Sequence, residues 1–226
     1  MNNQIAKITT FVVLLFFFAG SVQAQLLPKP KNPPKSIQSD PEATKILKQL
    51  QAKYEKFTGI YSDYVLIIDN RETKEEQNGK IIQKGDMFHV VNDGNQIFCD
   101  GVTLWMYMKK NNEVQINEYS KDDDPMSPNR ILKIYDAQDE FIYAITNDYG
   151  DKVDIEFKPV DTDVDFSKLR LEIDKVKLQV NYIKVFAKDG TVYTLDINII
   201  KDINPEDSAF KFNKLKFPGV KEVDMR

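Results

Sequence analysis

Short apolar runs with a period of two, separated by turn signals, fill most of the chain from residue 60 onward. Successive side chains of a strand point to opposite faces, so this period is typical of β-structure with one buried face. No segment of helix length separates these runs, which favours an antiparallel sheet built as a meander of hairpins. The predicted strands are 60–68, 79–84, 87–92, 96–100, 103–109, 113–119, 141–147, 153–159, 168–174, 178–187 and 191–200.

The turns between these runs carry residues that accept a positive φ angle, as tight hairpins require. Gly79 is assigned to a turn as well, so the glycines do not form a phosphate-binding loop. A meander this long must curl or close on itself. The turn pairs are Gly85-Asp86, Asp93-Gly94, Asp100-Gly101, Asn111-Asn112 and Asp189-Gly190.

Two helices accompany the predicted strands. Asp40 can cap the first, Pro41 suits its first position, and Gly59 is a suitable stop. Its apolar residues recur at helical spacing and form one stripe over about four turns. The second helix is short, spans 129–135, and follows the acidic, proline-bearing segment 120–128. The stripe of the first helix comprises Ala43, Ile46, Leu47, Leu50, Tyr54 and Phe57.

The N-terminal residues resemble an export signal. Lys7 precedes an apolar run over 11–19, and Val22-Gln23-Ala24 forms a small-x-small cleavage pattern. The run is too short for a membrane-spanning helix, which needs about 20 apolar residues. We therefore expect a signal peptide over 1–24, a flexible Pro/Lys-rich arm over 25–38, and one domain over 39–226. Gln25 stands where a lipoprotein would carry an acylated cysteine, so the expected product is soluble.

Catalytic and metal-binding constellations are missing from the sequence. His89 is the single histidine, and it has no partner for a metal site or for nucleophilic catalysis. Asp122, Asp123 and Asp124 lack calcium-loop spacing and are interpreted as a solvated loop. Glu113 and Glu118, five residues apart on one strand, face opposite sides. The formal net charge of −4, with both signs mixed along the chain, argues against nucleic-acid binding. We expect no enzyme activity, no metal and no cofactor.

The abundant aromatic residues allow two interpretations. They can fill the core of a closed sandwich or barrel, or they can line a partly hollow concave face that buries an apolar ligand. Cys99 is interpreted as a small buried hydrophobe, and as the single cysteine it has no intramolecular disulfide partner. The pattern alone leaves both interpretations of the aromatic residues open.

A family resemblance favours the second interpretation, a partly hollow concave face. The stretch Asp100-Gly101-Val102-Thr103-Leu104-Trp105-Met106-Tyr107 resembles the Asp-Gly-x-x-Leu-Trp-x-Tyr signature of LolA, the periplasmic carrier of outer-membrane lipoproteins. Residues 79–84 with Phe88 are similar to the family's Gly-x-Leu-x-x-Lys strand and its aromatic hairpin. Residues 113–116, Pro128 with Ile131 and Leu132, and the ending 210–224 follow in the family's order. The chain departs from the family pattern at one point. Many members have Arg-Pro directly after the lysine that corresponds to Lys84, and that arginine helps to hold the lid closed. Here Gly85 and Asp86 follow Lys84.

The resemblance implies a mainly β (α+β) fold: a strongly curved antiparallel sheet, or incomplete β-barrel, with helices forming a lid over a hydrophobic cavity. It implies a monomeric carrier that takes acylated lipoproteins from an inner-membrane transporter to an outer-membrane acceptor across the periplasm. The alternative is a periplasmic lipid- or partner-sensing domain on the same half-barrel. The residues that we expect to line the lipid-binding cavity of the half-barrel are Leu47, Leu50, Phe88, Val90, Trp105, Tyr107, Ile131, Leu132 and Tyr135.

Overall fold

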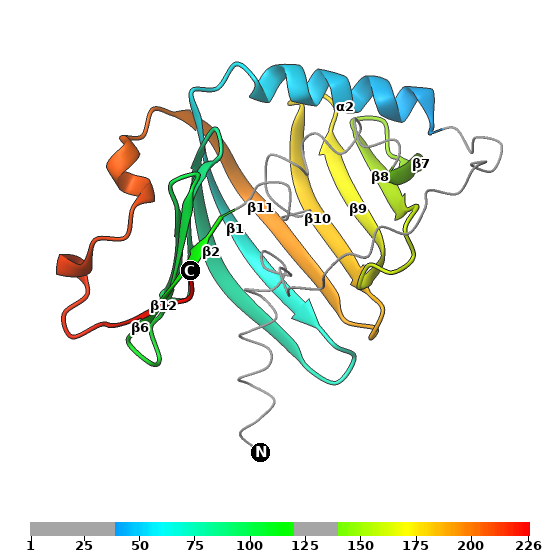
Figure 1. Cartoon of the computed structure of the whole chain (residues 1–226). Helices are drawn as coiled ribbons and strands as arrows, with labels where there is room; N and C mark the ends of the chain where they lie inside the picture. Colours follow the sequence, from blue (N-terminus) through cyan, green and yellow to red (C-terminus); the bar gives the residue numbers. More distant parts are fainter. Residues whose placement is uncertain (1–38, 120–139) are drawn as a thin grey trace, which may run out of the picture.

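The computed structural model describes residues 39–119 and 140–226, and its main feature is one 12-stranded sheet (Figure 1). The strand order is β12-β6-β5-β4-β3-β2-β1-β11-β10-β9-β8-β7, so the sheet curls without closing, and β12 and β7 are its two edges. The strands are β1 Gly59–Asp69, β2 Lys74–Lys84, β3 Met87–Asn92, β4 Asn95–Cys99, β5 Thr103–Met108, β6 Glu113–Glu118, β7 Phe141–Asp148, β8 Lys152–Pro159, β9 Phe166–Asp174, β10 Gln179–Ala187, β11 Val192–Ile203 and β12 Lys221–Asp224.

The predicted meander is confirmed from β1 to β6 and from β7 to β11, where every pair of neighbours is antiparallel. The prediction of an antiparallel sheet throughout is wrong at one edge. There, β12 pairs with β6 in parallel, with Val223 opposite Gln115. This strand is only four residues long and mostly charged, so no period of two marks it in the sequence.

The positive φ angles predicted for the hairpins are confirmed at Gly85, Gly94 and Gly190, among others. Gly79, in contrast, was assigned to a turn and lies within β2, which begins five residues earlier than predicted. The ring of Tyr64 on β1 lies over Gly79, and a Cβ atom there would come within 2.2 Å of it. Gly79 is therefore required for the close packing of an aromatic ring on the sheet.

The first predicted helix is confirmed as α2, Pro41–Tyr54. The Asp40 carboxylate caps it by accepting a hydrogen bond from the backbone N–H of Glu42 at 2.8 Å. Gly59 does not stop the helix, because α2 ends at Tyr54 and Gly59 begins β1. The second predicted helix, 129–135, lies outside the described residues.

Helix α2 lies across one end of the strands, as Figure 1 shows, and it is attached near both of its own ends. At its start, the Asp40 N–H donates to the carbonyl of Tyr143 on β7 at 2.9 Å. In its last turn, Lys53 Nζ donates to the carbonyl of Lys177 at 2.8 Å, in the β9–β10 turn. The buried stripe of α2 joins the main core cluster and comprises Ala43, Ile46, Leu47, Leu50 and Tyr54.

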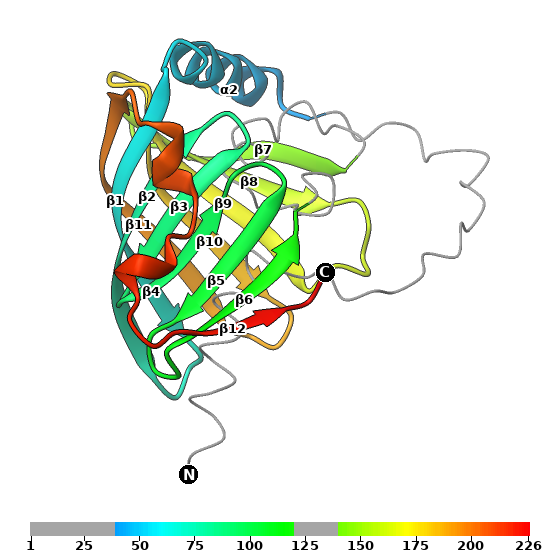
Figure 2. The same ribbon diagram turned by 60° about the vertical axis from the view of Figure 1, so that its left-hand side comes forward.

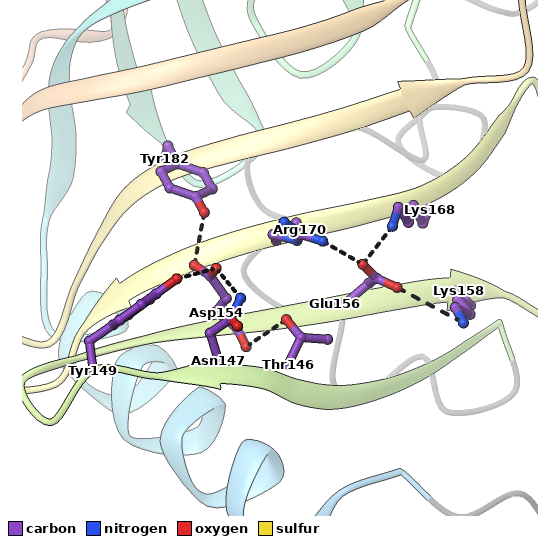
Figure 3. Close-up of polar contacts among 9 residues, drawn as sticks. All are labelled: Thr146, Asn147, Tyr149, Asp154, Glu156, Lys158, Lys168, Arg170 and Tyr182. Carbon is purple, nitrogen blue, oxygen red and sulfur yellow. Dashed lines mark hydrogen bonds and ion pairs between the residues drawn. The ribbon is translucent and has the colours of Figure 1, made fainter. Parts of the chain in front are cut away.

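The outer face of β7 to β10 is polar (Figure 3). The buried carboxylate of Asp154 accepts hydrogen bonds from the Tyr182 hydroxyl at 2.8 Å and from the Asn147 amide at 2.9 Å. Burial raises the pKa of Tyr182, and the bond to Asp154 adds to that effect. Burial also acts to raise the pKa of Glu156, but hydrogen bonds from Lys168 and Arg170 outweigh it and lower the pKa. This network joins neighbouring strands on the outer face, where Lys168 and Arg170 also lie over the ring of Phe186.

Candidate functional site

The concave face of the sheet carries a continuous apolar surface, which cross-strand registers assemble row by row. On β3 to β5, Phe88 is opposite Cys99, and Cys99 is opposite Leu104. In the next row, Val90 is opposite Ile97, and Ile97 is opposite Met106. All except the half-buried Met106 are buried within the main core cluster. Because side chains alternate along each strand, both rows point to the same face.

Helix α2 extends this surface. Leu47 and Leu50 are buried in the same extended core cluster that contains Phe88 and Val90. Other apolar side chains pack against the cluster while staying half-buried, and these are the ones that an apolar ligand could still cover. Among them are Ile81, Met106, Leu195 and Ile197.

A pocket of about 210 Å³ lies at the C-terminal end of α2, between that helix and the turn from β2 to β3. Its lining includes the aromatic rings of Tyr54 and Phe57, the side chain of Ile60 on β1, and Lys84. Burial raises the pKa of the Tyr54 hydroxyl to about 12, so that hydroxyl is neutral at ordinary pH. The lining also contains Gln51, Glu55, Thr58 and Gln83, so the pocket is mixed in polarity.

The structure corrects the expectation that Trp105 and Tyr107 line the same cavity. Trp105 is opposite Phe98, and Tyr107 is opposite Gln96, so both lie on the convex face. Tyr107 packs there against Phe217, with ring centroids 4.4 Å apart. The physical reason is the alternation of the strand, since Leu104 and Met106 occupy the concave positions of β5. The remaining predicted site residues, Ile131, Leu132 and Tyr135, lie outside the described residues.

The residues between β11 and β12 cover this convex apolar patch, and we call residues 204–220 the C-terminal segment. Figure 2 shows it crossing the outer side of β3 to β5. It contains the short 3₁₀ helices η2, Asp207–Phe210, and η3, Lys214–Lys216. Lys84 Nζ donates to the Asp207 carboxylate of this segment at 2.8 Å. Lys84, the last residue of β2, thus ties the sheet to the C-terminal segment.

His89, the single histidine of the chain, packs on an aromatic ring. His89 stacks on Phe98 with ring centroids 4.0 Å apart, and its Nε2 is 3.0 Å from the Gln96 side-chain oxygen. Burial lowers the pKa of His89. Within residues 39–119 and 140–226, no group of three or more His, Cys, Asp or Glu side chains is placed to hold a metal ion. No helix in those residues is long and apolar enough to cross a membrane.

Sequence reasoning missed several concave residues on strands it had located, namely Ile81, Leu195 and Ile197. The available signal was the alternation of side chains along each strand, because residues two apart lie on the same face. Ile81 is two residues from Gly79, and Leu195 and Ile197 continue the alternation that starts at the buried Tyr193. This alternation assigns residues to a face, but it does not say which face is concave.

Comparison with known proteins finds one curated protein with a similar sequence and several solved structures with a similar fold. An uncharacterized protein of Methanocaldococcus jannaschii is 31% identical over 115 residues, which are 50% of this chain and 29% of that protein. The chain therefore spans less than a third of the length of this curated relative. An uncharacterized conserved protein from Thermus thermophilus superposes with a TM-score of 0.52 at 12% identity, covering 81% of this chain and 99% of that one. A LolA superfamily protein from Nitrosomonas europaea gives a TM-score of 0.41 at 13% identity, covering 75% and 97%.

The family comparison is more specific. The model of the outer membrane lipoprotein carrier protein LolA matches residues 64–213. That range runs from β1 through the concave strands and into the C-terminal segment, and it covers more than half of the 226 residues. The resemblance noted in the sequence is confirmed, and the chain belongs to the LolA family of outer-membrane lipoprotein carrier proteins.

Proposed function

We propose that this protein is a periplasmic carrier that binds the acyl chains of lipoproteins released from the inner membrane and delivers them to the outer membrane. In this proposal residues 1–24 are a cleaved signal peptide, 25–38 a flexible arm, and 39–226 the soluble, monomeric carrier domain. Its partners are an inner-membrane lipoprotein-releasing transporter and an outer-membrane acceptor, and it carries out no catalysis.

The observation that carries this proposal is the apolar concave face in a chain of the LolA family. Each buried CH₂ group of an acyl chain contributes about 0.8 kcal/mol, so the half-buried side chains of this face offer a sufficient driving force. A carrier must also release its cargo. If α2 must move away from the sheet to admit acyl chains, the lost packing of Leu47 and Leu50 opposes binding and lowers the net affinity.

The proposed binding surface consists of two layers. Leu47, Leu50, Phe88 and Val90 form its buried layer, while the half-buried side chains of Ile81, Met106, Leu195 and Ile197 make the direct contacts with the acyl chains. Ile131, Leu132 and Tyr135 remain members of the site by sequence prediction.

Two substitutions on β2 test the site. Ile81→Glu adds one negative charge to the concave face, and Asn78→Glu adds the same charge to the exposed convex face of the same strand. A carboxylate against acyl chains lacks a partner and costs several kcal/mol if dry, so we expect Ile81→Glu to weaken binding at least tenfold. The measurement is displacement of an environment-sensitive apolar dye by an acylated peptide, with thermal melting recorded for both variants.

The proposed route needs its own readout. Purified wild-type protein should release lipoproteins from spheroplasts, and its mass should place the N-terminus at Gln25. Unchanged displacement in a folded Ile81→Glu protein would remove the concave face as the site. If the wild type binds the dye and yet releases no lipoprotein, a lipid- or partner-sensing role replaces the carrier role.

A further inference from the structure

The C-terminal segment presents one leucine to solvent while its aromatic residues hold it firmly on the sheet. Phe210 is fully buried, and the rings of Phe212 and Phe217 stack with centroids 4.8 Å apart. Leu215, in η3, is 91% exposed, more than any other large hydrophobic residue of the described chain. The Asn213 side chain fixes this turn by accepting from the Leu215 N–H at 3.0 Å. A single apolar side chain is thus held in water by a rigid support.

Three lysines lie near this leucine in the sequence. Lys211, Lys214 and Lys216 lie within four residues of it, and no acidic residue occurs between Asp207 and Glu222. Lys211 is 3.9 Å from Asp100, and Lys214 forms an ion pair with Glu222. Both lysine side chains nevertheless remain more than 60% exposed, so their ammonium groups can reach other anions. We call Leu215 with these three lysines the Leu215 knob.

The placement of the knob separates it from the concave face. The C-terminal segment lies on the outer side of β3 to β5, so contact through the knob leaves the concave surface free (Figure 2). The whole chain has a formal net charge of −4, which disfavours the approach of the molecule as a whole to an anionic surface. A local group of lysines then determines which side approaches that surface.

We propose that the Leu215 knob is the contact through which the folded protein touches an anionic lipid bilayer. Lysine ammonium groups bind lipid phosphates, and Leu215 enters the boundary between headgroups and acyl chains. Each lysine near an anionic bilayer raises the binding constant about fivefold. Burial of a leucine side chain raises the binding constant by a further factor of about ten. The resulting contact is weak and reversible, as a shuttling protein requires, and it supplements the proposed carrier function.

Vesicle flotation tests the knob. The protein is mixed with vesicles of phosphatidylglycerol and phosphatidylethanolamine, and separately with vesicles of phosphatidylcholine alone. We expect floating wild-type protein only with the anionic vesicles, and less of it at high salt. Leu215→Glu should reduce the bound fraction about tenfold or more. Val176→Glu is the matched control, because Val176 is an 80% exposed valine in the β9–β10 turn and the same charge is added there.

The outcomes separate this proposal from the carrier function. Leu215→Glu should melt and bind the apolar dye like wild type, because Leu215 packs against nothing that its loss would disturb. Equal flotation of Leu215→Glu and Val176→Glu would overturn the proposal, as would wild-type flotation that does not depend on lipid charge. If Leu215→Glu blocks lipoprotein delivery while wild type binds no vesicles, the knob contacts a protein and the bilayer proposal is also overturned.

Discussion

Two apolar clusters lie on opposite faces of the same strands, and each has a cover of a different kind. The concave cluster continues across most of the sheet and is covered at one end by α2. The convex patch around Phe98 and Tyr107 is small and covered by the C-terminal segment. The concave cover is a separate helix, whereas the convex cover continues into β12 and adds a strand to the sheet.

The difference lies in how each cover is attached. Release of the C-terminal segment breaks the hydrogen bonds between β12 and β6, the ion pair of Lys84 with Asp207, and the packing of Phe210. Release of α2 costs side-chain packing and the few hydrogen bonds near Asp40 and Lys53. We infer that the convex cover holds the sheet in shape, while α2 is the cover that can separate from it.

The largest expected effect is on the convex cover. Phe210→Ala removes a fully buried ring and should lower the free energy of unfolding by about 3–5 kcal/mol. Urea unfolding measures the loss, and Leu215→Ala, in the same segment but exposed, should change it by less than about 0.5 kcal/mol. A loss below about 1 kcal/mol for Phe210→Ala would mean that the segment is not a firm cover.

The sequence predicted much of this architecture because most elements carry local signals. Period-two patterning located β1 to β11, and the Asp40-Pro41 start with its apolar stripe located α2. It could not predict β12, because a four-residue charged strand is specified by the neighbouring β6 and not by its own pattern.

The candidate site was predictable in part, for a related reason. Phe88 and Val90 were correctly placed on one face, yet Trp105 and Tyr107 were assigned to that face when the register puts them on the other. A sequence shows which alternate residues of one strand share a face. Which of these sets lies on the same face as a given set of the next strand depends on the turn between the two strands. The Asp100-Gly101 turn fixes Leu104, and not Trp105, opposite Cys99.

The second prediction concerns the concave cover. Leu50→Ala removes buried packing from α2 and should lower the free energy of unfolding by about 3 kcal/mol. Unlike Phe210→Ala, it should also alter dye binding, because Leu50 belongs to the proposed binding surface. Dye titration and urea unfolding should be compared with Gln49→Ala, an exposed neighbour on the same helix. If Leu50→Ala and Phe210→Ala change dye binding equally, the two covers do not differ as inferred.

The smallest expected effect is a change of folding stability with pH. It arises from His89, which lies beneath the convex cover. Burial lowers its pKa from 6.5, and the nearby Lys216 on η3 adds to that shift, although the bond to Gln96 opposes it. As pH falls below 6.5, the unfolded chain therefore binds a proton that the folded protein does not. The stability from the neutral ring is complete above that pH and is lost as pH falls toward the lower pKa of the folded state. Carboxylates with lowered pKa values, such as Glu156, lose their stabilising charge only in more acidic solution, below 4.5.

Melting temperatures at about pH 7.5 and about pH 5.5 test this dependence. The wild type should melt at a lower temperature in the more acidic buffer. His89→Gln replaces the ring N–H that faces the Gln96 oxygen with an amide N–H and cannot titrate, so its melting temperature should fall less. Hydrogen exchange should place the acid-induced loosening in the C-terminal segment, since protonated His89 would lie near Lys216 beneath that cover. If acid lowers the melting temperature of both proteins equally, His89 does not control the convex cover. If hydrogen exchange shows loosening only in α2, the comparison of the two covers is reversed.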